Sequence, residues 1–162
     1  MKSLAIPLTL PLAILCCACI TQQKLQLRPI VLASEYYGPR NFTMVENDLL
    51  GDDETVFFYT EVTGFRTRKV DRHYEFWVSI DISLSDAAGN IYFEKKNEKE
   101  IHETNATKRP TYIYYKYPYY TGNLVLSGAY LVRIVATDKI SGTLAETSKE
   151  FQVNLSLTRA ED

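Results

Sequence analysis

Cysteine is absent from the sequence beyond residue 19. The three cysteines of the 162-residue chain are Cys16, Cys17 and Cys19, in the stretch LCCAC. The chain after this stretch therefore contains no internal disulfide, no thiolate metal site and no cysteine nucleophile. About 140 residues are enough for one domain with a hydrophobic core.

An excess of charge of one sign is also missing. The chain has 18 basic and 20 acidic residues, and no basic stripe is visible, which argues against a nucleic-acid groove. Glycine is scarce, with seven residues, whereas twelve tyrosines, seven phenylalanines and one tryptophan are present. This composition is typical of a globular, strand-rich protein and excludes a disordered one.

No apolar run is long enough to cross a bilayer. The longest, residues 4–15, has twelve residues, which span about 18 Å as a helix against a hydrocarbon core of roughly 30 Å. Pro7 and Pro11 also interrupt it. Because Lys2 precedes the run and small residues follow it, residues 1–19 are predicted to be an export signal. The alternative is a short membrane anchor that is never cleaved.

The end of this signal resembles a bacterial lipobox, in which a cysteine after a small residue is lipidated and becomes the new N-terminus. Cys19 follows Ala18, although Cys16 stands where that pattern usually has leucine. The resemblance implies lipidation of Cys19, a short tether at residues 20–24 and an extracytoplasmic location in a bacterial cell envelope. The attached acyl chains would hold the protein at a membrane. Ordinary cleavage with release, to the periplasm or the medium, is the alternative.

Alternation of apolar and polar residues predicts β-strands after the tether. The clearest case is residues 73–84, where period two holds over twelve residues. Residues 55–63 and 130–136 alternate in the same way, and DKISGT at 138–143 predicts a hairpin. The face of 73–84 predicted to enter the core carries Tyr74, Phe76, Val78, Ile80, Ile82 and Leu84.

No segment has the pattern of an amphipathic helix of ten or more residues. Residues 94–109 are polar with mixed charge and are predicted to form a solvated connection, with an extended edge as the alternative. Pro29 favours an edge position for its strand. The predicted fold is all-β: a single antiparallel β-sandwich of about seven to nine strands. It spans residues 25–156, and residues 157–162 form a loose tail.

Two stretches, SGAYLVRIVATDKISG and DETVFFYTEVTGF, resemble strands of the bacterial immunoglobulin-like (fibronectin III-like) β-sandwich domains of extracytoplasmic lipoproteins. The similarity covers roughly residues 50–155. Tyr130 stands where such domains have a tyrosine corner, and Val132 stands where an antibody domain has a cysteine. The resemblance implies an immunoglobulin-like scaffold without a disulfide, and a scaffold does not specify a function.

Residue patterns of known catalytic or metal sites are missing from the sequence. There is no G-x-S-x-G elbow, H-E-x-x-H helix or glycine-rich phosphate loop, and His73 and His102 lie apart. The acidic residues at 48–54 lack EF-hand spacing and indicate an acidic turn more than a calcium loop. We therefore predict no enzyme, no cofactor and no metal. The competing hypothesis is a secreted hydrolase whose carboxylates converge only in the fold.

The stretch TYIYYKYPYYTG has six tyrosines within residues 112–120. In an extended chain, aromatic rings occur on both faces, whereas a strand with one solvated face would be polar there. One interpretation is that the rings only cover the core. The other is a contact surface, because tyrosine offers large, stiff, amphipathic area. Candidate ligand-binding residues are Tyr112, Tyr114, Tyr115, Tyr117, Tyr119 and Tyr120, with Trp77, which falls on the polar phase of its strand.

These observations predict a non-catalytic binding or structural module, anchored at a membrane through its lipid, that contacts a protein or a cell-envelope polymer through an aromatic edge. A glycan receptor is an alternative, because flat rings stack on sugars. A component of a larger envelope complex, with the tyrosine edge buried against a neighbour, is another.

The lipid anchor can be tested by intact-mass analysis of the protein isolated from membranes. We expect the mature chain to begin at Cys19 and to carry the added mass of acyl chains. A chain that retains Met1, or one that is cleaved without added mass, would contradict the lipoprotein prediction.

Overall fold

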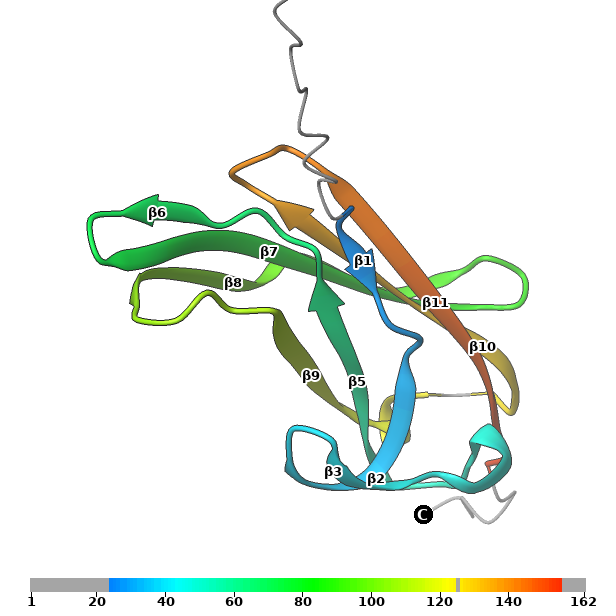
Figure 1. The fold of residues 1–162 in the computed structure, drawn as a ribbon. Helices are drawn as coiled ribbons and strands as arrows, with labels where there is room; N and C mark the ends of the chain where they lie inside the picture. The colour runs from blue at the N-terminus through cyan, green and yellow to red at the C-terminus, as the bar shows by residue number, and fades with distance from the viewer. Residues whose placement is uncertain (1–23, 125, 156–162) are drawn as a thin grey trace, which may run out of the picture.

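The computed structural model describes residues 24–124 and 126–155, which form two β-sheets packed face to face (Figure 1). The predicted signal, Cys19, most of the tether and the tail lie outside these residues. Sheet A contains β1 (Gln26–Leu27), β2 (Val31–Gly38), β3 (Asn41–Met44), β5 (Thr55–Thr63) and β9 (Tyr112–Tyr120). Sheet B contains β4 (Leu49–Leu50), β6 (Arg68–Val70), β7 (His73–Asp86), β8 (Ile91–Ala106), β10 (Gly128–Asp138) and β11 (Leu144–Val153).

This arrangement confirms the all-β sandwich. Apart from the short parallel pairing of β4 with β11, all strand pairs are antiparallel. The described residues contain two 3₁₀ turns, Glu46–Asp48 and Thr121–Asn123, and no α-helix. None of them forms a helix with the length and apolar character that crossing a bilayer requires. The described residues form eleven strands, more than the seven to nine predicted, because several strands are only two to four residues long.

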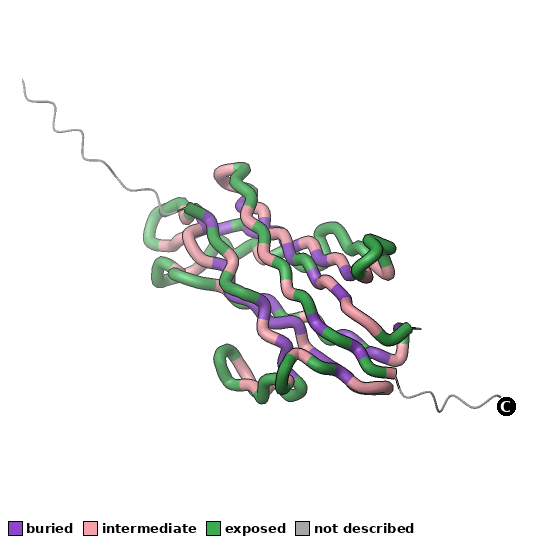
Figure 2. Tube along the Cα trace, turned by 90° about the vertical axis from the view of Figure 1, so that its right-hand side faces the viewer, coloured by how far each residue is buried: buried purple, intermediate pink, exposed green. Residues whose placement is uncertain are grey.

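The core lies between the sheets and follows the predicted alternation. In β7, the residues from Phe76 to Leu84 that share one face are all buried, and Trp77 lies on the opposite face. Figure 2 shows buried and exposed residues alternating along the strands, with exposed loops at the ends of the sandwich. Each sheet contributes large side chains to this core, among them Phe58 from β5 and Phe151 from β11, whose ring centroids are 5.7 Å apart.

The pairing of the chain with β5 is interrupted at Pro29, between β1 and β2. Both strands pair with the same side of β5, β1 at Val62 and Thr63 and β2 farther along, while the Arg28 N–H donates to the Glu61 carbonyl at 2.8 Å. Proline has no N–H to donate, so it occupies the gap in the ladder. Beyond the break, β2 leaves β5 and pairs with β3 in a hairpin.

Residues 94–109 form an extended edge and not a connection, since most of this segment belongs to β8, the longest described strand. It pairs with β7 along nearly its whole length at the edge of sheet B. Backbone hydrogen bonds define this strand, and an edge position lets its charged side chains remain in water. A bulge accommodates Asn97, which has a φ of 52° and donates its backbone N–H to the Asp81 carboxylate at 2.7 Å.

The predicted hairpin at DKISGT joins β10 to β11 and is organised by Asp138. This carboxylate is 1% exposed and accepts bonds from the Ile140 N–H at 2.9 Å and the Ser141 hydroxyl at 2.6 Å. It also accepts the Arg66 N–H at 2.7 Å, which ties the hairpin to the link between β5 and β6. Gly142, with a φ of 73°, closes the turn.

Tyr130 forms the hydrogen bond that defines a tyrosine corner. Its ring is buried, and its hydroxyl donates to the Leu126 carbonyl at 2.7 Å. Val132, two positions later, lies fully buried in the core. The side chains at both positions are therefore part of the core, and the Tyr130–Leu126 bond joins β10 to the loop before it.

Replacing Tyr130 by phenylalanine should lower the free energy of unfolding by about 1 kcal/mol, the usual net value of one such bond. Urea denaturation measures the change, with Tyr37→Phe as the control because Tyr37 is an exposed tyrosine of the β2–β3 hairpin. Equal stability of Tyr130→Phe and the parent would show that the corner bond contributes nothing.

Candidate functional site

The tyrosines of β9 divide by face. β9 pairs with β5 over all nine of its residues and lies at the edge of sheet A. Tyr115 and Tyr119 point inward and are only 4% and 6% exposed, and Tyr117 packs against Phe93 of β8 at 5.6 Å. Burial raises the pKa of Tyr119 to about 12 and that of Tyr115 further. Tyr115 and Tyr119 therefore complete the core, and the partly buried Tyr117 packs against it.

The alternate tyrosines of β9 point away from the core. Tyr112, Tyr114 and Tyr120 are 38%, 41% and 45% exposed. The Tyr120 hydroxyl donates to Asp53 at 3.0 Å at the C-terminal end of the strand. The aromatic rings of β9 therefore serve the core on one face and are accessible on the other.

The outer face of sheet A is partly buried, which is unusual for the solvent side of a sandwich. Tyr59 and Glu61 lie on the outward phase of β5 and are only 4% and 3% exposed. The β2–β3 hairpin covers them, with the Phe42 and Tyr36 rings 5.0 Å and 6.0 Å from Tyr59. We call this surface the aromatic face; it comprises Tyr36, Phe42, Phe57, Tyr59, Tyr112 and Tyr114 with Arg28, Arg40, Glu61 and Lys116.

Glu61 is the centre of the polar contacts on the aromatic face. Arg40 binds it with two bonds, Nε to Oε1 at 2.5 Å and Nη2 to Oε2 at 2.7 Å. The Tyr59 hydroxyl donates to Oε1 at 3.0 Å, and Arg28 Nε lies 3.3 Å from Oε2. A buried carboxylate needs such partners, because leaving one uncompensated is strongly unfavourable. The Arg40 bond, followed in importance by that from Tyr59, holds the Glu61 pKa below its usual value despite burial.

Arg40 reaches Glu61 because of the turn that carries it. It follows Gly38 and Pro39 between β2 and β3 and has a φ of 60°, in the left-handed region. Its guanidinium also lies 4.6 Å from the centre of the Tyr112 ring. The turn is thereby fixed over both β5 and β9, and Glu61 raises the pKa of Arg40.

Tyr36 adds a polar group without a hydrogen-bond partner to the aromatic face. Its hydroxyl oxygen is buried and makes no hydrogen bond of normal geometry, although the Tyr114 ring lies nearby at 6.4 Å. Burial, and then the neighbouring Tyr114 phenol, raises the Tyr36 pKa to about 12. Lys116 Nζ lies 4.2 Å above the Tyr36 ring as a cation–π contact. The face therefore combines stiff rings, cations and an unused hydroxyl.

The open edge of β9 is protected against strand addition. The Thr121 N–H donates to the Glu54 carbonyl, and the alternation of an antiparallel ladder from that bond places residue 118 among those facing away from β5. Pro118 occupies this position and has no N–H for an added strand. A partner would therefore find the outer face of β9 more accessible than its edge.

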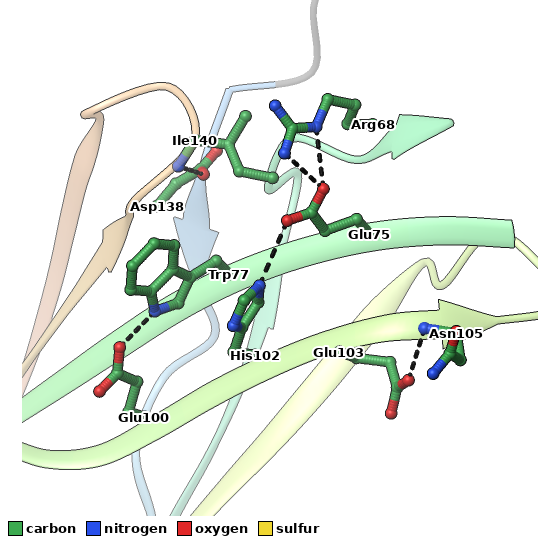
Figure 3. A network of polar contacts seen from close by, with 9 residues as sticks. All are labelled: Arg68, Glu75, Trp77, Glu100, His102, Glu103, Asn105, Asp138 and Ile140. Carbon is green, nitrogen blue, oxygen red and sulfur yellow. Dashed lines mark hydrogen bonds and ion pairs between the residues drawn. The ribbon is translucent and has the colours of Figure 1, made fainter. Parts of the chain in front are cut away.

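Trp77 lies on the outer face of sheet B, apart from the β9 tyrosines. It is 36% exposed, its indole N–H donates to Glu100, and its ring stacks on His102 at 4.7 Å (Figure 3). His102 Nε2 lies 3.2 Å from Glu75, which Arg68 binds at 2.6 and 2.8 Å. Arg68, followed by His102, lowers the Glu75 pKa. The structure therefore does not bring Trp77 together with the other predicted ligand-binding residues.

The carboxylates of the acidic turn are engaged in local contacts. Asp48 pairs with Lys149 at 2.5 Å, and Glu54 accepts the Gly51 N–H at 3.1 Å. Among the described residues, no three histidine, cysteine or acidic side chains gather in a way that could hold a metal ion.

Sequence reasoning missed Tyr36, Arg40 and Glu61 as site residues. A usable signal existed for Glu61, because it shares the outward phase of its strand with Phe57 and Tyr59. The sequence contains no such signal for Arg40 and Tyr36, since their positions depend on how the β2–β3 hairpin folds over sheet A.

Neither protein-family models nor curated protein sequences match this chain. Among solved structures, it is similar to the C-terminal domain of wzt, with a TM-score of 0.55, 10% identity and coverage of 87% of this chain and 84% of that one. A DNA-bound alkylpurine DNA glycosylase AlkC of Pseudomonas fluorescens has a TM-score of 0.43, 9% identity and coverage of 81% and 30%, too distant to inform fold or function. The first comparison shows a shared β-rich fold and does not identify a function.

The Glu61 contacts predict part of the acid sensitivity of the protein. The pKa of Glu61 is lower in the folded protein than in the unfolded chain, where it is about 4.3. Between these two pKa values the unfolded chain therefore binds more protons than the folded protein. The stabilisation is complete above that pH and is lost as the pH falls through the folded pKa. Glu61→Gln should therefore flatten the fall in unfolding free energy between about pH 5 and 2.

Urea denaturation at a series of pH values measures this slope. Some slope should remain in Glu61→Gln, because the pKa values of Glu35, Glu75 and Asp86 are also lowered. Glu150→Gln, at an exposed position of β11, is the matched control. An unchanged slope in Glu61→Gln would contradict the role given to the Arg40–Glu61 contact.

Proposed function

We propose that the protein is a non-catalytic, extracytoplasmic binding module of the bacterial cell envelope that contacts a protein or an envelope polymer through the aromatic face. The observation that carries the proposal is a buried carboxylate fixed among aromatic rings on the outer side of a sheet. A sandwich does not need this arrangement for its core, and burying a charge is costly. Perturbed ionisable groups of this kind cluster at functional sites.

The composition of the aromatic face supports binding. Tyrosine and arginine are the residue types that most often dominate binding energy at interfaces, and both are concentrated here. Tyr59 and Tyr114 stack with centroids 6.3 Å apart, and Arg40 lies over Tyr112. These contacts hold the rings in place before a partner arrives, which lowers the entropy lost on binding.

The absence of catalysis is part of the proposal and follows from the roles of the polar groups. Glycoside hydrolysis needs a pair of carboxylates flanking the bond to be cleaved. Glu61 is the one carboxylate among the ten residues of the aromatic face, and its oxygens accept bonds from Arg40 and Tyr59. Lipidation at Cys19 is also part of the proposal and would hold the module at a membrane.

Two triple substitutions separate binding from folding. Tyr112, Tyr114 and Tyr120 replaced together by serine should reduce sedimentation with isolated cell envelopes at least about tenfold, as expected when hot-spot residues are lost. The melting temperature should fall much less than in the inward triple variant, because these rings are 38–45% exposed and lie outside the core. Tyr115, Tyr117 and Tyr119 replaced by serine should instead unfold the domain, since truncating large core side chains costs about 3–5 kcal/mol each.

Trp77→Ser is the control for the opposite sheet and should retain envelope binding. Undiminished sedimentation of the outward triple variant would refute the proposal. Loss of binding in Trp77→Ser alone would transfer the site to the outer face of sheet B.

A further inference from the structure

We infer that the partner of the aromatic face is an acidic polysaccharide, whose carboxylates pair with Arg28 and Lys116 while its sugar rings lie on Tyr112 and Tyr114. This inference rests on the proposed function and selects one of the polymers it allows.

The charge of the face differs from that of the whole chain. The full sequence carries a formal charge of −2, whereas the aromatic face has three cations, Arg28, Arg40 and Lys116, against the one acid Glu61. The side chains of Arg28 and Arg40 are 64% and 56% exposed, while that of Glu61 is 4% exposed. Cations are therefore presented to solvent and the compensating anion is enclosed. Such complementarity favours and steers an anionic partner.

The spacing of these groups favours a chain of anions over a single small one. In the register of sheet A, Arg28 bonds to Glu61, Glu61 lies opposite Tyr114, and Lys116 follows two residues along β9. Arg28 and Tyr114 are therefore two strand spacings apart, about 10 Å, and Lys116 lies about 7 Å farther along β9. These backbone positions are spread over more than the width of one small anion, whereas a linear polymer with repeated carboxylates spans them.

The contacts of Glu61 show that the groups of this face can bind a carboxylate, and we take this as support for a carboxylate partner. Arg40 engages this carboxylate with two parallel bonds, the geometry typical of arginine with a planar carboxylate. Arg28 and the Tyr59 hydroxyl approach the same group. In the register of sheet A, Tyr114 lies between Arg28 and Lys116, and Tyr112 follows on the other side of Tyr114. The exposed parts of these two rings suit the flat faces of sugar rings better than a compact anion.

The test uses the processed full-length protein and immobilised polygalacturonate, with immobilised dextran as the neutral glycan. We expect binding to polygalacturonate that weakens with added salt, and none to dextran. The double variant Arg28→Gln/Lys116→Gln should bind at least about tenfold more weakly, because two charge-assisted contacts are lost. The matched control, Arg133→Gln/Lys139→Gln, removes the same charges from β10 and the turn that follows it, and should bind like the parent. Circular dichroism confirms that both variants are folded.

Several outcomes would overturn the inference: equal weakening of both double variants, equal retention on dextran, or tighter binding to a polyphosphate or a single-stranded oligonucleotide. Failure to bind polygalacturonate, while the outward tyrosine triple still loses envelope binding, would remove the acidic polysaccharide and leave the proposed function standing. Failure of both would remove the proposed function as well.

Discussion

The burial of one carboxylate on the outside of a sheet constrains the architecture of sheet A. Glu61 is 3% exposed on the face of β5 that points away from the core. A charge can remain there only when its oxygens are bound, and most of the partners come from elsewhere in the chain. Arg40 supplies two bonds from the β2–β3 turn, so the hairpin must fold over sheet A for the carboxylate to be compensated. The cover over Tyr59 and the position of Tyr36 follow from this one contact.

A sheet with two partly buried faces explains the tyrosine-rich strand. β9 must supply rings inward, where Tyr115 and Tyr119 complete the core, and rings outward, where Tyr114 stacks on Tyr59. Tyrosine suits both positions, because its ring packs like an apolar group and its hydroxyl tolerates water. Core cover therefore describes Tyr115 and Tyr119, and the contact surface that we propose is formed by the alternate residues of the same strand. Pro118 removes one N–H donor from the open edge of this strand.

Local patterns predicted the features that depend on neighbouring residues. The alternation of β7, the hairpin at Asp138 and the corner at Tyr130 were predictable, because each is defined within a short stretch. The pairing of β8 with β7 was not predictable, since it is made by backbone bonds and does not require an apolar alternation among the charged side chains of β8. The Arg40–Glu61 contact, which spans 21 positions, depends on the path of a hairpin, and Trp77 is separated from the tyrosines by the sandwich itself. Residue types indicated an aromatic surface, but tertiary folding decided its members.

The dependence of the outer face on the Arg40–Glu61 contact is the central claim, and a double-mutant cycle tests it most directly. Unfolding free energies would be measured at neutral pH for Arg40→Gln, Glu61→Gln and the double variant. Arg40→Gln should destabilise the protein because it leaves Glu61 buried without its main partner, and adding Glu61→Gln should recover much of that loss. Losses that simply add would show that the two residues act independently and would contradict the account.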